Sequence, residues 1–517
     1  MYRIGIDVGG TNTDAIILDE RHRLIHAVKS PTSLDIKTGI ETSLRNLLQE
    51  ANIDKTKITH AMLGTTQCTN AIVERKKLAK VGVIRLGYPA TASVPPYTAW
   101  PNDMVEKLSG NYALVQGGYE YDGQLLGEVN EAEIKALLEE WRDKVESIAV
   151  IGVFSSIKND QEFQVRDVIH EVYGEEFPVS CSSLIGSVGL IERENATILN
   201  AALCKVIETT TQGFVHALEE EGITDAAVYL CQNDGTLMSI EYAKQFPILT
   251  IACGPTNSIR GASYLAQIKD TMVLDVGGTT SDIGVLQDGF PRESSVAVEV
   301  GDIRTNFRMP DIISVGLGGG SIVRVDDRGR ITVGPDSVGY RIGEEALVFG
   351  GSTLTTTDIA VRLGLAEVGD KSLVSHIEED FAKAVQAEIA AIVEQAIDKM
   401  KTSSEDVKLV LVGGGSIIIP DTIRGVASMM KTENGNVANA IGASIAQISG
   451  QYEQIYIYSR EPREASLKDA EEKAVKQAVL AGAASDTIEL VEVEETPLAY
   501  HPENATRLRV KVVGKMK

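Results

Sequence analysis

Near its start the chain reads Ile4-Gly5-Ile6-Asp7-Val8-Gly9-Gly10-Thr11-Asn12-Thr13-Asp14, an apolar strand that ends on a carboxylate and turns through two glycines lined with hydroxyls. Glycine lets a phosphate approach bare backbone, where amides and threonine hydroxyls can donate to its oxygens. An Asp at the strand end can hold a hydrated Mg²⁺, because this ion keeps most of its waters and takes one or two carboxylates. Alone, the pattern also fits an ordinary tight hairpin.

The pattern occurs a second time, at Leu274-Asp275-Val276-Gly277-Gly278-Thr279-Thr280-Ser281-Asp282. Asp7 aligns with Asp275, and Asp14 aligns with Asp282. Internal similarity of this kind marks duplicated structural units. Two such hairpins facing each other would hold a polyphosphate from both sides.

A third element reads Leu409-Val410-Leu411-Val412-Gly413-Gly414-Gly415-Ser416, again a buried strand that runs into glycines. A strand followed by bare backbone suits a base and ribose lying flat against it. In this order, the three elements resemble the phosphate-1, phosphate-2 and adenosine motifs of the actin-like ATPase superfamily, which includes sugar kinases, Hsp70 and actin.

Further stretches narrow the resemblance to the hydantoinase/oxoprolinase family, in its A-type branch. These stretches are Gly64-Thr65-Thr66-Gln67-Cys68-Thr69-Asn70-Ala71, Gly189-Leu190-Ile191-Glu192-Arg193 through Asn200-Ala201, Gly254-Pro255-Thr256-Asn257-Ser258-Ile259-Arg260-Gly261-Ala262, Gly318-Gly319-Gly320-Ser321-Ile322 and Thr355-Thr356-Thr357-Asp358. The resemblance covers roughly residues 1 to 450. It is specific to the family and does not specify a substrate.

The resemblance implies an α/β fold of two ribonuclease H-like (actin-like ATPase) domains, with an inserted α/β segment and a small C-terminal α/β appendage. We expect the first domain with its insertion at residues 1–190. The second domain, with the phosphate-2 and adenosine motifs, is expected at 191–450 and the appendage at 451–517. Strands and helices alternate along the chain, which is typical of α/β proteins.

Helical spacing of apolar residues predicts an amphipathic helix at Ile36–Ala51. Longer helices are predicted at 195–221 and 373–401. The segment 87–114 is rich in Pro, Tyr and Ala, and we expect a loop-rich insertion there. This insertion either lines a substrate cleft or is a surface excursion without function.

The resemblance implies ATP and Mg²⁺ as cofactors. Asp7 and Asp275 would hold the metal and, with Asp14 and Asp282, form the catalytic set; a purely structural turn role for the latter two is the alternative. The remaining cofactor-binding residues fall on the two turns and the third element. They are Gly9, Gly10, Thr11, Asn12, Thr13, Gly277, Gly278, Thr279 and Thr280 for the phosphates, and Gly413, Gly414 and Gly415 for the adenosine.

The implied reaction is ATP-dependent hydrolysis of a cyclic amide, such as a hydantoin, 5-oxoproline or a related lactam, through phosphorylation of the carbonyl oxygen. Phosphoryl transfer asks the protein mainly for positioning and charge neutralisation. Two rivals remain open: a small-molecule kinase of the same fold, whose product keeps the phosphate, and a chaperone-like ATPase that acts on a partner enzyme.

The composition excludes some partners. The net charge of −24 argues against non-specific binding to nucleic acid or to an anionic membrane, since either needs a basic face. The five scattered cysteines form no CxxC pair, and no secretory signal or membrane span is evident. We therefore expect a cytoplasmic protein. From the resemblance we expect an oligomer that acts on a small cyclic amide, with a second protein subunit as a possible partner.

Several residues carry two interpretations. Cys68 and Cys253 adjoin family motifs and are either nucleophiles or apolar filler. Glu192 and Arg193 either steady an anion or form a structural ion pair, and Gly318-Gly319-Gly320 either approaches a ligand or allows a strand crossing. Members of the family commonly have histidine where this chain has Leu63 and Gln161. The seven histidines show no HxH or HExxH spacing, so a transition-metal site is not expected.

Overall fold

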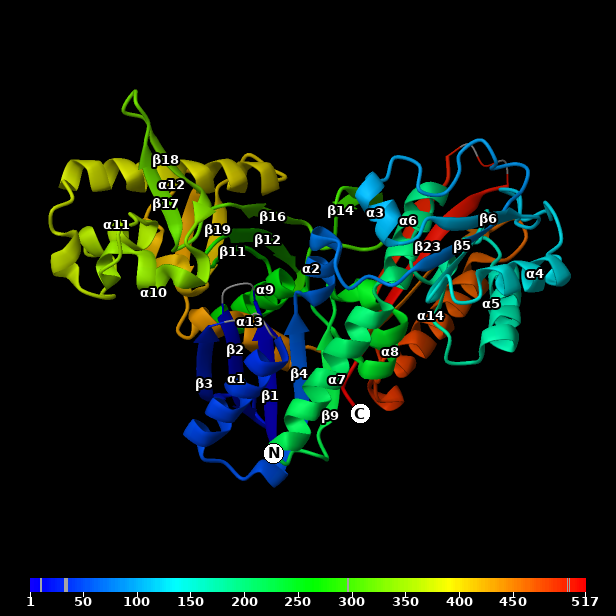
Figure 1. Ribbon diagram of the computed structural model, residues 1–517, viewed down its shortest axis with the longest axis horizontal. Helices are drawn as coiled ribbons and strands as arrows, with labels where there is room; N and C mark the ends of the chain where they lie inside the picture. Colours follow the sequence, from blue (N-terminus) through cyan, green and yellow to red (C-terminus); the bar gives the residue numbers. More distant parts are fainter. Residues whose placement is uncertain (10–11, 32–35, 295–296, 500, 502) are drawn as a thin grey trace.

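The computed structural model describes residues 1–9, 12–31, 36–294, 297–499, 501 and 503–517. It has two lobes, each built on a β-sheet, with two helices between the sheets (Figure 1). No helix in the described part of the chain is both long enough and apolar enough to cross a membrane.

Nine strands of the described chain form the first sheet, in the order β22-β23-β21-β10-β9-β4-β1-β2-β3. In chain order, their bounds are β1 Tyr2–Val8, β2 Asn12–Asp19, β3 Leu24–Pro31, β4 Ile58–Thr65, β9 Ala227–Cys231, β10 Leu237–Ser239, β21 Ile448–Ile457, β22 Glu489–Pro497 and β23 Ala505–Gly514. β1 and β2 form an antiparallel hairpin, whereas β1, β4 and β9 run parallel. The expected appendage is α/β as predicted, and its strands extend the first sheet.

The second sheet has the order β13-β12-β11-β19-β20, with β16 also paired to β12. The bounds are β11 Thr271–Val276, β12 Ser281–Gln287, β13 Phe290–Pro291, β16 Ile312–Val315, β19 Val407–Val412 and β20 Val426–Lys431. β11 and β12 again form an antiparallel hairpin, and β11 runs parallel to β19. The second sheet therefore repeats the hairpin-plus-parallel-strand arrangement of the first.

The third sheet, β6-β5-β7-β8, forms the inserted segment and is parallel throughout. Its strands are β5 Val81–Leu86, β6 Asn111–Val115, β7 Ser147–Gly152 and β8 Val179–Cys181. Two short hairpins complete the strands: β14 Val298–Val300 with β15 Ile303–Thr305, and β17 Ser321–Val325 with β18 Ile331–Ser337.

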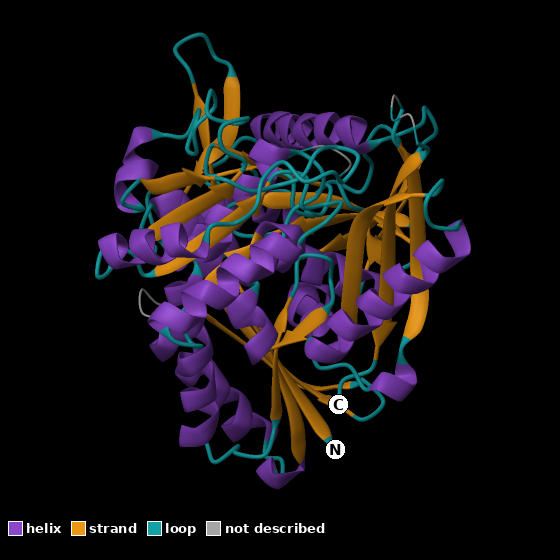
Figure 2. Cartoon of the chain, turned by 90° about the vertical axis from the view of Figure 1, so that its right-hand side faces the viewer, coloured by secondary structure: helices purple, strands orange, loops and turns teal. Residues whose placement is uncertain are grey.

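The helices cover the sheets on both sides (Figure 2). Their bounds are α1 Ile36–Ala51, α2 Gln67–Glu74, α3 Asn102–Lys107, α4 Glu131–Trp141, α5 Asp160–Tyr173, α6 Leu190–Ala202, α7 Cys204–Glu220, α8 Ile240–Gln245, α9 Cys253–Ala266, α10 Ile342–Glu345, α11 Thr356–Arg362, α12 Glu379–Met400, α13 Ala438–Ile445 and α14 Arg463–Leu480. The prediction for α1 is confirmed to the residue.

Two sequence predictions need correction. The helix expected at 195–221 is two helices, α6 and α7, because the carbonyl of Ala202 accepts from the amide of Ala79 (2.8 Å) and leaves the helical ladder. The helix expected from residue 373 begins at Glu379, since Asp370 caps a separate turn through the amide of Ser372. The segment 87–114 is loop-rich as predicted, with α3 and the first residues of β6 as its regular elements.

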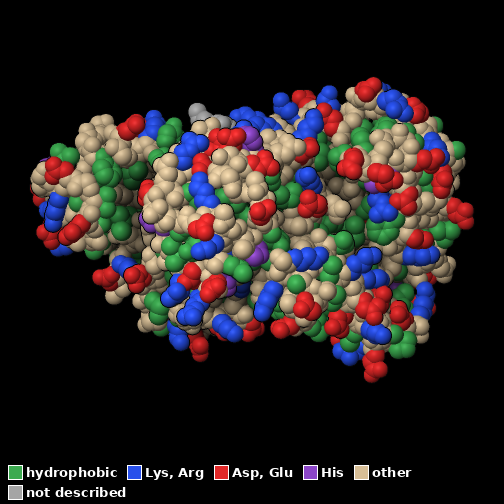
Figure 3. All heavy atoms as spheres, turned by 90° about the horizontal axis from the view of Figure 1, so that it is seen from below, with side chains coloured by type: hydrophobic (Ala, Val, Ile, Leu, Met, Phe, Trp, Pro, Cys, Tyr) green, Lys and Arg blue, Asp and Glu red, His purple; other side chains and the backbone are tan. Residues whose placement is uncertain are grey.

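Both signs of charge occur over the whole face of the molecule shown in Figure 3, where acidic and basic side chains are interspersed. The large negative net charge is therefore not gathered into one patch on this face.

Candidate active site

The first turn follows β1. Asp7 lies opposite Asp14 in the hairpin, and the amide of Gly9 donates to the carbonyl of Asn12 (3.0 Å). Both carboxylates are buried, because the sheet and the helices close around the ends of these strands. Two of the predicted phosphate-binding residues, Gly10 and Thr11, lie outside the described residues.

The second turn has the same construction. Asp275 lies opposite Asp282, and the amide of Gly277 donates to the carbonyl of Thr280 (2.9 Å). Thr280 thus takes the place that Asn12 has in the first turn. The repeat seen in the sequence is therefore a repeat of backbone hydrogen bonding as well.

A glycine in or directly after the neighbouring parallel strand makes room for the carboxylates of Asp7 and Asp275. A Cβ atom on Gly64, opposite Asp7, would lie 2.1 Å from Oδ1 of Asp7. A Cβ atom on Gly413, at the end of β19, would lie 2.3 Å from Oδ1 of Asp275. Contacts this short cannot exist, so both carboxylates need a glycine beside them.

Two helices between the sheets join the carboxylates of the two lobes. On α9, Asn257 Nδ2 donates to Asp7 Oδ1 (3.2 Å), and the next residue, Ser258, is hydrogen-bonded to Asp275. On α13, Asn439 Nδ2 donates to Asp7 Oδ2 (3.0 Å) and to Asp14 Oδ2 (2.9 Å). Adjacent residues of α9 therefore hold one carboxylate from each lobe.

The sequence analysis missed these three polar partners and one cation. Asn257 and Ser258 lie within a quoted family stretch, which was a usable signal, whereas nothing around Asn439 distinguished it. The cation is Lys29, whose Nζ lies 2.6 Å from Oδ1 of Asp14. Lys29 is opposite Asp14 in the β2–β3 register, and only the structure brings it to the turn.

Burial is the main electrostatic effect at the site. It raises the pKa of Asp7 to about 6, opposed by the hydrogen bond from Asn257 and reinforced by the charge of Asp14. Burial likewise raises the pKa of Asp282 to about 6 and raises the pKa of Asp275. The charge of Asp275 also contributes to raising the pKa of Asp7.

These carboxylates fit a hydrated Mg²⁺. They bring concentrated negative charge, and within the described residues Lys29 is the cation that forms an ion pair with one of them. The described residues contain no group of three or more His, Cys, Asp or Glu side chains arranged to hold a metal. A metal here would have few protein ligands and several waters, which is the usual mode of Mg²⁺.

The glycine-rich loop 318–320 packs against the second turn. The amide of Gly319 donates to the carbonyl of Gly277 (3.0 Å), and that of Gly320 donates to the carbonyl of Gly278 (2.7 Å). The hydroxyl of Thr357 in turn donates to the carbonyl of Gly319 (2.7 Å). The loop therefore supports the second turn, which favours a role at the site over a simple strand crossing.

Gly413, Gly414 and Gly415 also lie beside the second turn. The amide of Gly413 donates to the carbonyl of Gly435 (2.9 Å), and a Cβ atom on Gly415 would lie 2.3 Å from the carbonyl oxygen of Gly277.

In the first turn, the hydroxyl of Thr13 is buried and has no hydrogen-bond partner among the described residues. A bound phosphate oxygen would supply that partner.

Arg193 is structural. It is buried and donates to the carbonyl of Gly152 (2.8 Å) and the hydroxyl of Ser182 (3.0 Å). Its neighbour Glu192 forms an ion pair with Arg304 (3.5 Å). The bonds of Arg193 tie the end of β7 to the loop before α6.

The two cysteines beside family motifs are not poised for nucleophilic attack. Burial raises the pKa of both the Cys68 and the Cys253 thiols to about 12, so each is a neutral thiol near pH 7. Their environment fits the alternative of apolar filler.

The residues that replace the family histidines have structural contacts. Leu63 is fully buried in the core of the first sheet. Gln161 accepts from the amide of Gly118 (2.6 Å) and donates to the carbonyl of Gly127 (2.9 Å), so it fastens a loop of the inserted segment.

Two family models match this chain. Residues 3–173 match the model of the hydantoinase/oxoprolinase N-terminal region, and residues 193–368 match the hydantoinase/oxoprolinase model that follows it. Together they span most of the chain up to residue 368.

Two curated relatives show the extent of the similarity. The alpha subunit of the caprolactamase of Pseudomonas jessenii is 26% identical over 70% of this chain and 54% of its own length. The gamma subunit of the acetophenone carboxylase of Aromatoleum aromaticum is also 26% identical, over 70% of this chain and 53% of its own. This chain therefore spans about half the length of these relatives.

Among solved structures, the ATP-dependent caprolactamase from Pseudomonas jessenii superposes with a TM-score of 0.80. The match covers 100% of this chain and 88% of that one, at 19% sequence identity. This similarity supports the two-lobed α/β fold.

Proposed function

Because this chain belongs to the hydantoinase/oxoprolinase family, we propose that it uses ATP to activate and hydrolyse a cyclic amide. The observation that supports this most directly is the pair of matching turns, whose carboxylates Asp7 and Asp275 are joined through adjacent residues of α9. The chain covers only part of its relatives, so the substrate and any partner protein belong to the same proposal.

In the proposed reaction, the carbonyl oxygen of the amide attacks the γ-phosphorus of ATP. The bond from that phosphorus to the β,γ-bridging oxygen breaks, and ADP leaves. Water then adds to the activated carbon and the C–N bond opens with a proton on the ring nitrogen, which leaves an acyl phosphate. A second water attacks the carbonyl carbon of the acyl phosphate, so phosphate departs with the former carbonyl oxygen and the carboxylate is released. An amide oxygen is a poor leaving group until it becomes part of a phosphate.

The residues of the two turns have the proposed roles of binding and orientation. The phosphates are held by Gly9, Gly10, Thr11, Asn12 and Thr13 on one side and by Gly277, Gly278, Thr279 and Thr280 on the other. Asp7 and Asp275 hold hydrated Mg²⁺, which neutralises phosphate charge when bound. Asp14 and Asp282 orient the loops, and Gly413, Gly414 and Gly415 lie under the adenosine.

The names of the relatives bear on the finer points. One relative is an ATP-dependent lactamase and another belongs to a carboxylase, so carbonyl activation is the shared element and hydrolysis is our choice for this chain. Because both curated relatives are named as subunits, we also propose that this chain works with a second protein.

An oxygen-transfer experiment tests the proposal. A lactam labelled with ¹⁸O at its carbonyl is incubated with Mg·ATP and the protein, alone and with proteins that co-purify with it. We expect the label in inorganic phosphate, detected by ³¹P NMR, together with the ring-opened amino acid. Unlabelled phosphate would contradict carbonyl phosphorylation, and a product that keeps the phosphate would indicate a kinase. ATPase activity stimulated by a protein and not by lactams would indicate the chaperone-like role.

A further inference from the structure

A second candidate site lies further along the carboxyl-terminal edge of the first sheet. It is a cavity of about 120 Å³ bounded by the loop after β9, by β21 and by the segment 183–187. β9 is two strands from β1, since Asp7 is opposite Gly64 of β4 and Leu63 of β4 is opposite Leu230. The cavity therefore lies at the edge on which Asp7 lies, where open α/β sheets bind their ligands.

A larger cavity of about 630 Å³ adjoins it. The two share four lining residues, Ser187, Asn306, Arg308 and Glu453. The larger cavity is also lined by Phe290 and Glu293 of the second lobe and by Arg509 of β23, so the two cavities form one path between the lobes.

Three side chains of the smaller cavity have an unsatisfied polar atom. Ser183 Oγ, Asn306 Oδ1 and Arg308 Nη2 are buried without a hydrogen-bond partner in the part of the chain that the structure describes. The orientation of the Asn306 amide is fixed, because its Nδ2 donates to the carbonyls of Ser187 (3.0 Å) and Val188 (3.1 Å). Oδ1 is therefore an acceptor that lacks a donor, and such unpaired atoms cost free energy unless a ligand pairs them.

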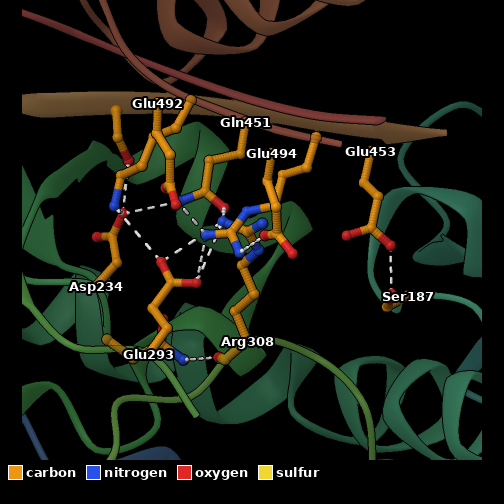
Figure 4. Close-up of polar contacts among 12 residues, drawn as sticks. Ser187, Asp234, Glu293, Arg308, Gln451, Glu453, Glu492 and Glu494 are labelled. Atoms are coloured by element: carbon orange, nitrogen blue, oxygen red, sulfur yellow. Dashed lines mark hydrogen bonds and ion pairs between the residues drawn. The ribbon is translucent and has the colours of Figure 1, made fainter. Parts of the chain in front are cut away.

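The cations beside the cavity are paired with carboxylates. Asp234 accepts from Ser449 Oγ (3.0 Å) and Gln451 Nε2 (3.1 Å) and forms an ion pair with Lys511 (3.0 Å; Figure 4). Arg308 Nη1 donates to Gln451 Oε1 (2.5 Å) and lies 3.3 Å from Glu293 (Figure 4). Arg308 and Lys511 are thus already paired with carboxylates, which disfavours the burial of an anionic ligand, whereas Glu453 accepts from the hydroxyl of Ser187 (Figure 4).

We propose that this cavity, named here the amide pocket, binds an uncharged cyclic amide, whose carbonyl oxygen accepts from Arg308 and from the hydroxyl of Ser183 and whose N–H donates to Asn306. A ring forces the amide to be cis, so its C=O and N–H point to the same side. Open-chain amides are trans and present these groups on opposite sides. Asn306 and Arg308 come from one short segment, so the pocket selects the ring form. The identification of this ligand as the substrate rests on the proposed function.

Calorimetry without nucleotide tests the pocket. The probes are 2-pyrrolidinone and hydantoin as uncharged rings, N-methylacetamide as an open-chain amide and 5-oxoproline as an anionic ring. We expect the uncharged rings to bind at least tenfold more tightly than the other two. Equal or tighter binding of N-methylacetamide or 5-oxoproline would overturn the proposal.

Matched variants locate the binding. Ser183→Ala removes a hydroxyl that has no hydrogen-bond partner, so we expect an intact fold and severalfold weaker lactam binding, with a larger loss in Arg308→Met. Ser43→Ala, on α1, removes another buried and unpartnered hydroxyl and should leave lactam binding unchanged. Wild-type affinity in Ser183→Ala and Arg308→Met would overturn the proposal.

The same variants separate this inference from the proposed function. If lactam-dependent ATP hydrolysis occurs and is unaffected in Ser183→Ala and Arg308→Met, the pocket is wrong and the function stands. If lactams bind in a Ser183-dependent way but ATP is never consumed, the pocket stands and the function is wrong. Mg·ATP affinity should be unchanged in Ser183→Ala.

Discussion

The two carboxylate turns share their backbone but differ in what surrounds them. Lys29 on β3 and Ser314 on β16 occupy equivalent positions, opposite Asp14 and Asp282 respectively. The first turn thus has an ammonium group where the second has a hydroxyl, which donates to Asp282. The first turn is also held by the amides of Asn257 and Asn439, whereas the second is packed by the glycine loops 318–320 and 413–415.

This difference indicates a division of work between the lobes. Side chains with charge and strong dipoles gather at the first turn, where they would help to balance the charge of the proposed phosphate and metal. Bare backbone gathers at the second turn, where a flat ligand can lie against it. The duplication kept the turn and left the side chains free to diverge.

The largest effect is expected from Asp7→Ala and Asp275→Ala, which ask whether both turns hold the metal. Each should lower kcat/KM for ATP hydrolysis by about 1000-fold, roughly 4 kcal/mol, and abolish measurable Mg·ATP binding while leaving the fold intact. Asp225→Ala, at an exposed position, should change neither quantity. Retained Mg·ATP affinity in both variants would remove the role assigned to these residues.

A smaller loss is expected when the glycine beside each carboxylate gains a methyl group. Gly64→Ala and Gly413→Ala place a Cβ atom against Asp7 and Asp275 and should each cost about 100-fold in ATP turnover, with about 2 kcal/mol of stability. Gly213→Ala, in α7, meets nothing closer than 4.0 Å and should be neutral or stabilising. Normal turnover in either site variant would mean that its carboxylate need not stay in place.

Replacing Lys29, the cation of the first turn, tests the difference between the two turns directly. Lys29→Met should weaken Mg·ATP binding about tenfold, about 1.4 kcal/mol, because the triphosphate loses a favourable charge. Lys37→Met, which removes an exposed lysine paired with Glu41 at 3.7 Å, serves as the control. Transplanting the charge in the double variant Lys29→Met, Ser314→Lys asks whether the lobes are interchangeable. Calorimetric affinity that stays low in the double variant shows that they are not.

The smallest expected effect is on the pH dependence of the unfolding free energy of the nucleotide-free protein. The pKa of Asp282 is about 6 in the fold, above the usual value of about 3.9 for an unfolded chain, so the folded state binds this proton more tightly. The resulting stabilisation is complete below pH 4 and is lost as the pH rises through 6. Asp282→Asn should therefore reduce the difference in unfolding free energy between pH 5 and pH 8 by about 1 kcal/mol.

Urea denaturation at the two pH values measures that difference. Asp225→Asn, which changes an exposed carboxylate, should leave the pH dependence as in the wild type. An identical pH dependence in Asp282→Asn and the wild type would show that the fold does not disfavour the ionised form of Asp282.

Much of the fold could be predicted from local patterns, and the site could be predicted in part. The strand-Asp-Gly-Gly pattern is contained in a dozen residues, so both turns and α1 could be read without the structure. The partners of Asp7 could not, because Asn257 and Asn439 lie 250 and 432 residues away along the chain. Lys29 gave no signal either, since its role depends on strand pairing and not on its neighbours in sequence.

The break between α6 and α7 shows the same limit on a smaller scale. The residues around Leu203 suit a continuous helix, and a single bond from Ala79 to the carbonyl of Ala202 interrupts it. Helical periodicity reports which face is buried. It does not predict which backbone groups of the helix will form hydrogen bonds with a distant segment of the chain.

The first sheet takes one side from the beginning of the chain (β1 to β4), β9 and β10 from residues 227–239, and β21, β22 and β23 from residues beyond 447. During synthesis, the short strand β10 is therefore an open edge while more than two hundred further residues leave the ribosome. An unpaired edge of this kind invites contact with other nascent chains. Production of this protein is thus expected to depend on the supply of chaperones, and a chain cut after α13 is expected to aggregate rather than to yield a smaller working enzyme.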